Sequence, residues 1–202
     1  MSGEQEQQAE RLRLAVLLSG SGRSLDNLLQ TIANGDLDAE IVAVVSSKPG
    51  VRGLEIAERA GIPSATFARR AFESDKTYSD AVLDWIEPFL RKVIVPSRWE
   101  RRILNIHPAL LPESGFGGKG FYGHHVHAAV LASGATASGA TVHIVDNEYD
   151  HGPVVMRAEV PVLPGDTPDA LASRVFTAEQ ALYPAAIREY ASDNPWLFAR
   201  AE

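Results

Sequence analysis

The chain has 202 residues, enough for a single domain, and 45% of them are hydrophobic, as in a protein that buries a sizeable core. Nineteen Lys and Arg against 26 Asp and Glu give a net charge of -7, which argues against a non-specific nucleic-acid binder. With no cysteine, disulfides, thiolate nucleophiles and cysteine-bound zinc are excluded. The sequence has no apolar stretch of signal-peptide or bilayer-spanning length, so we expect a cytoplasmic protein without membrane partners.

The first half of the chain predicts alternating strands and helices. Residues 1–10 are polar and predict a disordered tail, so the single expected domain covers residues 11–202. The apolar run LRLAVLL at 12–18 is followed by the turn SGSGRS and a helical LDNLLQTIA, which together predict a βα unit. Further strands are expected at 41–45 and 64–67, and helices at 54–60 and 76–90. This alternation indicates a parallel sheet covered by helices on both faces.

The second half has a different pattern. Residues 140–145 and 154–162 are rich in β-forming residues, and a polar, Gly/Pro-containing segment connects them. Such a connection is compatible with a hairpin or with the edge of a mixed sheet. Residues 169–190 predict a long final helix, with a kink or a break at Pro184.

The turn SGSGRS carries Gly20 and Gly22 and precedes a helix. Glycines there allow backbone N–H groups to face a ligand, and the helix N-terminus favours an anion such as a phosphate. The turn lacks the third glycine and the acidic residue of a dinucleotide site, and it lacks the Lys of a P-loop. Phosphate-monoester binding and a plain tight turn both remain open, and Arg23 favours the phosphate.

The segment LNIHPALLP carries an amide and an imidazole two positions apart, at Asn105 and His107. Residues two apart in a strand point to the same side, so these two side chains can converge. An amide N–H and an imidazolium are a suitable pair to stabilise the oxyanion that develops in acyl transfer. The alternative is a structural histidine near the end of a strand.

A second polar group follows in TVH, where Thr141 and His143 precede Asp150 in the connecting segment. An Asp near a His can orient its ring, set its protonation state or relay a proton itself. The alternative is a surface carboxylate and a half-buried strand histidine.

The histidines 124, 125 and 127 follow a glycine-rich stretch and resemble a metal-binding cluster. Adjacent residues rarely bind one ion from regular structure, and no carboxylate lies at a standard ligand spacing beside them. We therefore interpret the stretch as a mobile glycine loop that enters a helix, and we expect no metal.

Taken in chain order, four segments resemble the folate-dependent phosphoribosylglycinamide formyltransferases: SGSGRSLDNLL, LNIHPALLP, GATVHIVDNEYDHGPV and RVFTAEQALYP. The resemblance runs from about residue 14 to about residue 190. It implies a Rossmann-like α/β formyltransferase fold of three layers, with a central mixed, mostly parallel sheet. It also implies transfer of a formyl group from the co-substrate 10-formyltetrahydrofolate to the amine of glycinamide ribonucleotide in purine biosynthesis. We expect only these small-molecule partners, no nucleic acid, and a monomer or homodimer.

The resemblance also implies roles for individual residues. The catalytic residues fall on Asn105, His107 and Asp150, with Thr141 and His143 supporting them. The residues that bind the phosphate and ribose of the nucleotide fall on Gly22, Arg23, Ser24 and Glu179. The residues that bind folate fall on Leu90, Arg91, Lys92 and Val93, together with Asn105.

The implied mechanism is a direct attack of the amine on the formyl carbon, without an acyl-enzyme. Asn105 and protonated His107 would hold the tetrahedral oxyanion. Asp150 would help to remove the amine proton, directly or through water, and support the charge on His107.

The sequence departs from the family pattern at several places. Arg23-Ser24 stands where the family usually has Ser-Asn, and Phe176 stands where it often has Lys or Gln. Arg157 stands where a Gln is common, and we have no explanation for this replacement. We interpret Arg23 as supplying the phosphate-binding cation that Phe176 cannot supply. The hydrophobic strand that the family has before Leu90 is missing. Either residues 92–95 form a shortened strand, or the natural chain contains residues that this sequence lacks.

Because of these departures from the family pattern, two other functions remain open. One is a formyltransferase of the same fold that acts on another amine, such as a nucleotide-sugar. The other is a non-catalytic, nucleotide-binding relative with a degraded folate site.

Overall fold

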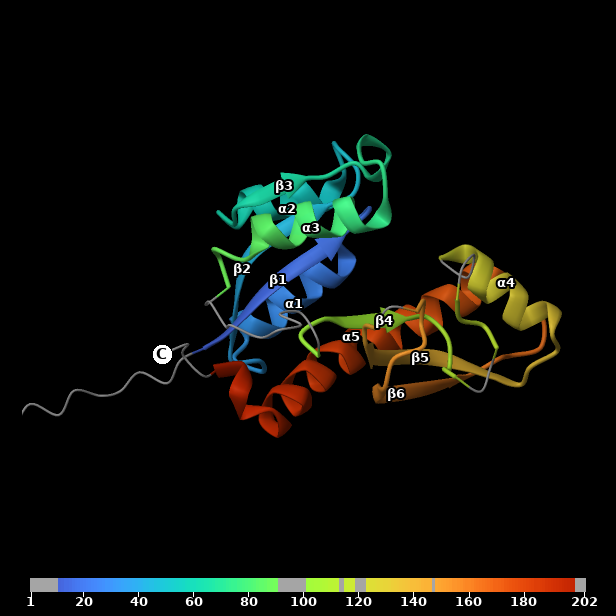
Figure 1. The fold of residues 1–202 in the computed structure, drawn as a ribbon. Coiled ribbons are helices and arrows are strands. Elements are labelled where there is room, and N and C mark those ends of the chain that lie inside the picture. The colour runs from blue at the N-terminus through green and yellow to red at the C-terminus, as the bar shows by residue number, and fades with distance from the viewer. Residues whose placement is uncertain (1–10, 91–100, 113–114, 119–122, 147, 199–202) are drawn as a thin grey trace, which may run out of the picture. The chain divides into compact units, whose positions relative to one another are not determined.

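The computed structural model describes residues 11–90, 101–112, 115–118, 123–146 and 148–198 (Figure 1). The chain divides into two compact units, Met1–Ile94 with Pro195–Glu202, and Val95–Asn194. The expected tail at 1–10 lies outside the described residues. No helix among the described residues is both long and apolar enough to cross a membrane.

The first unit is a small α/β structure built on a parallel sheet. Its elements are β1 (Leu12–Leu18), α1 (Arg23–Ala33), β2 (Ala39–Ser46), α2 (Arg52–Arg59), β3 (Ser64–Thr66), the 3-10 turn η1 (Arg69–Ala71) and α3 (Asp75–Ile86), with η2 (Pro195–Phe198) near the C-terminus. The strand order is β1-β2-β3, and both pairs are parallel, as the alternating pattern predicts. β2 is buried over almost its whole length, which explains its continuous apolar sequence.

The turn between β1 and α1 requires a glycine for a packing reason. Gly22 has a φ of 70°, and a Cβ at this position would lie 2.5 Å from the Cα of Gly53 at the start of α2. The backbone N–H of Gly53 also donates to the carbonyl of Gly20. The glycines of SGSGRS therefore let the turn pack closely against α2, whatever the turn binds.

The second unit contains an antiparallel sheet and two helices. Its elements are β4 (Leu104–His107), α4 (His124–Ala132), β5 (Ala137–Ile144), β6 (Val154–Pro161) and α5 (Pro168–Asp193). The order is β4-β5-β6, and β5 and β6 form the hairpin that the sequence allowed (Figure 1). α5 packs against β5 and β6, and α4 packs against α5. Ten buried residues form the core between these elements: Ala109, Val126, Val130, Ala140, Val142, Val160, Leu171, Val175, Leu182 and Ala186.

α5 also fixes the start of β4 through two tyrosines. Tyr190 donates its hydroxyl to the carbonyl of Arg101 at 2.8 Å, and Tyr183 donates to the carbonyl of Leu104 at 3.3 Å. Burial raises the pKa of Tyr183 to about 12, so its hydroxyl keeps its proton near neutral pH. The helix runs through Pro184 without interruption, so the expected break is absent.

In the part of the chain that is described, the strands form one parallel and one antiparallel sheet of three strands each. β1 is an edge strand of the parallel sheet, and β4 is an edge strand of the antiparallel one. Between α3 and β4 only residues 87–90 and 101–103 are described, and they form no strand. The proposed shortened strand at 92–95 lies outside the described residues. The α/β class is confirmed, and its parallel and antiparallel parts belong to different units.

The connection from β6 to α5 depends on one ion pair. The guanidinium of Arg174 donates to both carboxylate oxygens of Asp166, at 2.7 and 2.9 Å. Asp166 also accepts the backbone N–H of Leu163 at 2.8 Å. The hydrogen bonds from Arg174 are the main reason that the pKa of Asp166 falls from its ordinary value of 3.8 to about 2.

Asp166 therefore makes a predictable contribution to acid stability. Because its folded-state pKa is lowered, the carboxylate stabilises the fold above pH 4, and this contribution is lost as the pH falls from about 4 to about 2. We expect Asp166→Asn to lower the Tm at pH 7 by several degrees and to flatten the fall in Tm below pH 4. Thermal unfolding across pH measures this, with the exposed Glu159→Gln as control. Equal acid sensitivity of wild type and Asp166→Asn would contradict the assignment.

Candidate functional site

Four of the five residues predicted to be catalytic or supporting lie on two paired strands of the second unit, and Asp150 lies in the loop after the second strand. Asn105 and His107 are on β4 and face His143 and Thr141 on β5, in antiparallel register. His107, Thr141 and His143 are buried, and Asn105 is partly buried. The structure thus brings together residues that are up to 38 positions apart, through the strand pairing alone.

Asp150 is the centre of this group of side chains. Its Oδ2 accepts the backbone N–H of Gly118 at 2.9 Å and lies 3.4 Å from Nδ1 of His107. Its Oδ1 lies 3.4 Å from Nδ2 of Asn105 and 3.6 Å from Nε2 of His143. The carboxylate therefore faces four nitrogen atoms, and we call Asn105, His107, His143 and Asp150 the Asp150 cluster.

The contacts of His107 indicate where its protons are. Nε2 lies 2.7 Å from the carbonyl oxygen of Phe116, which can only accept, so Nε2 carries a hydrogen. Nδ1 faces the carboxylate of Asp150. An imidazole with oxygen acceptors at both nitrogens is best matched when both carry hydrogens, which is the imidazolium form.

The partner of His143 decides the role of its ring. Nδ2 of Asn105 can only donate, so Nε2 of His143 presents a lone pair to it, and Nδ1 donates to the carbonyl oxygen of Ile144 at 3.1 Å. That lone pair accepts a hydrogen bond from Nδ2 of Asn105 at 3.1 Å. His143 thus fixes the amide of Asn105 with its hydrogens toward Asp150 and its carbonyl oxygen away.

A tight loop after β5 holds Asp150 in place. Asp150 has a φ of 55°, a left-handed conformation that Asp tolerates better than most residues. Near the loop ends, Nδ1 of His151 lies 3.0 Å from Oδ2 of Asp146, and this hydrogen bond is the main cause of the lowered pKa of Asp146 and the raised pKa of His151. Gly152 admits no side chain, because a Cβ there would lie 1.8 Å from the carbonyl oxygen of Ile144.

Thr141 supports the site from outside the Asp150 cluster. Among the described residues we observe no hydrogen bond between Thr141 and the cluster. Its buried hydroxyl donates to the carbonyl of Ala109 at 2.7 Å and accepts the N–H of Leu111 at 3.0 Å. These bonds anchor the segment that leaves β4 and so fix the position of His107.

The other predicted residues are distributed over both units. Gly22, Arg23 and Ser24 form the start of α1 in the first unit, where Arg23 is exposed and Gly22 provides no side-chain cap. Glu179 is partly buried on α5 in the second unit. Of the predicted folate-binding turn, only Leu90 is described, and Arg91, Lys92 and Val93 lie outside the described residues.

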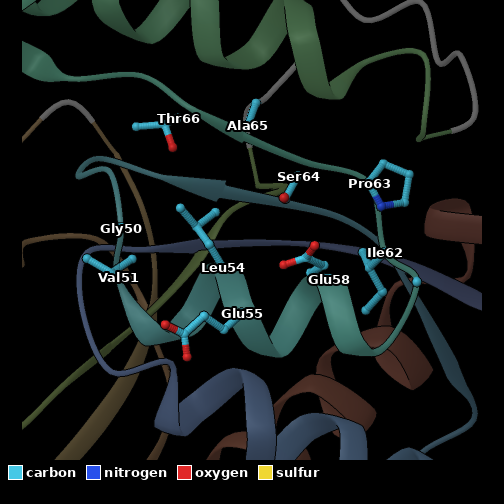
Figure 2. A pocket seen from close by; sticks show the side chains of 11 residues that line it. Gly50, Val51, Leu54, Glu55, Glu58, Ile62, Pro63, Ser64, Ala65 and Thr66 are labelled. Atoms are coloured by element: carbon cyan, nitrogen blue, oxygen red, sulfur yellow. The ribbon is translucent and has the colours of Figure 1, made fainter.

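A separate cleft of about 630 Å³ lies between α2 and the segment that leads into β3 (Figure 2). Its lining includes the carboxylates of Glu55 and Glu58 and the apolar side chain of Leu54. The cleft contains none of the predicted site residues and no basic side chain among its lining residues. Its acidic lining does not suit a phosphate.

The three histidines near α4 do not form a metal site with other residues. α4 begins at His124, as expected for a loop entering a helix. His124 pairs with Asp169 at 3.5 Å, whereas His127 is buried. In the described ranges, no group of three or more His, Asp or Glu side chains is arranged to hold a metal ion.

Sequence reasoning missed two participants in the site. Both are backbone groups, the carbonyl of Phe116 and the N–H of Gly118, which no side-chain pattern indicates. It also missed the burial of His127, whose pKa is lowered by burial and, to a smaller extent, by His124 and His107. The sequence contained a signal for this burial. His127 follows Val126 directly and precedes Val130 by about one helical turn, so it shares the apolar, buried face of the helix.

Comparison with known proteins identifies the family. Residues 12–187 match the family model described as formyl transferase. The chain belongs to the formyl transferase family. It is 34% identical over 192 residues to the phosphoribosylglycinamide formyltransferase of Escherichia coli K12, a match that covers 89% of this chain and 87% of the relative.

Other relatives are consistent with this membership. A solved glycinamide ribonucleotide transformylase 1 from Symbiobacterium toebii has a TM-score of 0.80 and 33% identity, over 91% of this formyl transferase chain and 89% of that one. The trifunctional purine biosynthetic protein adenosine-3 of Gallus gallus is 38% identical over 92% of this chain. The match covers only 19% of that longer protein, and matches to further trifunctional relatives likewise cover 14% to 19% of their length.

The geometry makes a sharp prediction for Asp150. Asn has the same shape and tolerates the left-handed conformation, but it lacks the charge that Gly118, His107 and Asn105 face. We expect Asp150→Asn to keep the wild-type Tm within a few degrees and to lose formyl transfer by roughly a hundredfold or more. Thermal unfolding and turnover are measured on the same preparation. Near-wild-type turnover of this folded variant would remove Asp150 from the catalytic group.

Proposed function

We propose that this protein transfers a formyl group from 10-formyltetrahydrofolate to the amine of glycinamide ribonucleotide, in the cytoplasm, as a monomer or homodimer. The observation that supports this most is the Asp150 cluster, which unites a carboxylate, an imidazole with two acceptors and an oriented amide. These are the groups needed to accept an amine proton and to stabilise an oxyanion. The named relatives with well-covered lengths are phosphoribosylglycinamide formyltransferases.

The distances in the cluster support a specific sequence of events. The contacts of Asp150 with Asn105 and His107 are both 3.4 Å, longer than good hydrogen bonds, so a substrate atom can replace them. The amine attacks the formyl carbon, and its proton passes to Asp150, directly or through water. Neutralised Asp150 then holds the two donors less strongly. They become available to the oxyanion as it forms. The oxyanion then collapses, the bond between the formyl carbon and the folate nitrogen breaks, and the proton on Asp150 passes to that nitrogen, directly or through water.

The first unit supplies the proposed phosphate site. Backbone N–H groups at the start of α1 and the exposed guanidinium of Arg23 suit a phosphate monoester. We assign Gly22, Arg23 and Ser24 to the phosphate and Glu179 to the ribose. Leu90, Arg91, Lys92 and Val93, together with Asn105, remain our proposal for folate.

A direct assay tests the function. We expect formyl transfer from 10-formyltetrahydrofolate to glycinamide ribonucleotide, and we expect His107→Asn to lower kcat by roughly a hundredfold or more, with a smaller change in KM. The reason is that an Asn side chain at position 107 can still donate a hydrogen bond but cannot carry a positive charge. No transfer by the folded wild-type protein, with nucleotide binding retained, would favour a non-catalytic binding protein.

Arg23 tests the identity of the acceptor. We expect Arg23→Ala to raise the KM for glycinamide ribonucleotide by roughly tenfold or more, and to leave the KM for an acceptor without the phosphate unchanged. The exposed Arg59→Ala on α2 is a matched control. If Arg23→Ala affects both acceptors equally, Arg23 does not bind the phosphate. The altered phosphate turn, with Arg23-Ser24, also allows a nucleotide-sugar amine as the acceptor. Better turnover of such an amine than of glycinamide ribonucleotide would favour this alternative.

A further inference from the structure

His127 has a buried nitrogen atom with no hydrogen-bond partner among the described residues. Its side chain belongs to a residue that is only 5% exposed, and its Nδ1 has no hydrogen-bond partner there. A buried imidazole nitrogen without a partner costs about 1–3 kcal/mol relative to a satisfied one, and native proteins rarely retain such groups without a use. This unsatisfied atom calls for an explanation.

The position of His127 connects it to the Asp150 cluster. The segment before α4 contacts the cluster twice, through the carbonyl of Phe116 and the N–H of Gly118. On α4, Val126 and Val130 join the same core as Ala109, which follows His107 by two residues. Burial is the main cause of the lowered pKa of His127, and the charges of His124 and His107 contribute to it.

Two acceptors of the Asp150 cluster are already engaged. The carboxylate of Asp150 faces N–H groups of Gly118, His107 and Asn105, and Nε2 of His143 accepts from Asn105. An attacking primary amine has two N–H bonds besides the lone pair that forms the new bond. If Asp150 takes one hydrogen, the second needs another acceptor. Burial keeps His127 neutral, and a neutral imidazole offers one lone pair.

We propose that His127 is a further substrate-binding residue, whose Nδ1 accepts a hydrogen bond from the primary amine of the acceptor. This hydrogen bond orients the amine lone pair toward the formyl carbon, and no proton is transferred to His127. The inference rests on the proposed function, since it assigns a second contact to the amine that reacts there. It gives the unsatisfied nitrogen its partner when the substrate is bound.

Two variants with different acceptor capacity test this contact. His127→Leu fills the space without an acceptor, whereas His127→Gln keeps one. We expect His127→Leu to lower kcat/KM for the amine acceptor by roughly tenfold or more, without a change in the KM for the formyl donor, and His127→Gln to restore much of the loss. His124→Gln, on the exposed side of the same helix, is the control and should match wild type. An unchanged kcat/KM in folded His127→Leu would overturn the proposal.

A second measurement on the wild-type protein does not depend on how the variants fold. NMR of the imidazole nitrogens should show a shift of Nδ1 of His127 when glycinamide ribonucleotide is added without a formyl donor. Saturating nucleotide that leaves this signal in place would overturn the proposal. The two failures are distinguishable: a protein without formyl transfer fails the assay whatever the NMR result, whereas active protein with an unmoved His127 signal fails only this inference.

Discussion

The carboxylate of Asp150 is the interaction on which the proposed chemistry depends. It holds the amide of Asn105, the ring of His107 and the backbone of Gly118 around one negative charge. The side chains of Asp150 and His107 are both largely removed from water, which strengthens any electrostatic interaction between them relative to one at the surface. A substitution that removes the charge of Asp150 and keeps the shape of its side chain separates the electrostatic role of this residue from its structural role.

The site combines rigid and adaptable parts. Asn105, His107 and His143 lie on paired strands, and α5 and the hydroxyl of Thr141 fix the ends of β4. Asp150 comes from a loop whose course is set by the Asp146–His151 hydrogen bond and by the close packing of Gly152. Strands fix the donors precisely, and the loop brings the one group that must change its protonation state.

The strands of the described residues fall into two groups. β1, β2 and β3 form a parallel sheet, and β4, β5 and β6 form an antiparallel one. The sequence lacks the hydrophobic strand that the family has before Leu90, and residues 91–100 lie outside the described ranges. The Asp150 cluster is unaffected, because all its members belong to the second unit.

Local sequence determined the elements of the structure. The apolar run at 12–18, the glycine turn after it and the strand positions of Asn105 and His107 were predictable, because side-chain period and glycine geometry act over a few residues. Only the tertiary structure decided that His143 orients Asn105, that Phe116 and Gly118 contact the cluster through their backbones, and that His127 is buried. These facts depend on strand register and on which loop passes the sheet edge, and both are set by packing between residues far apart in the sequence.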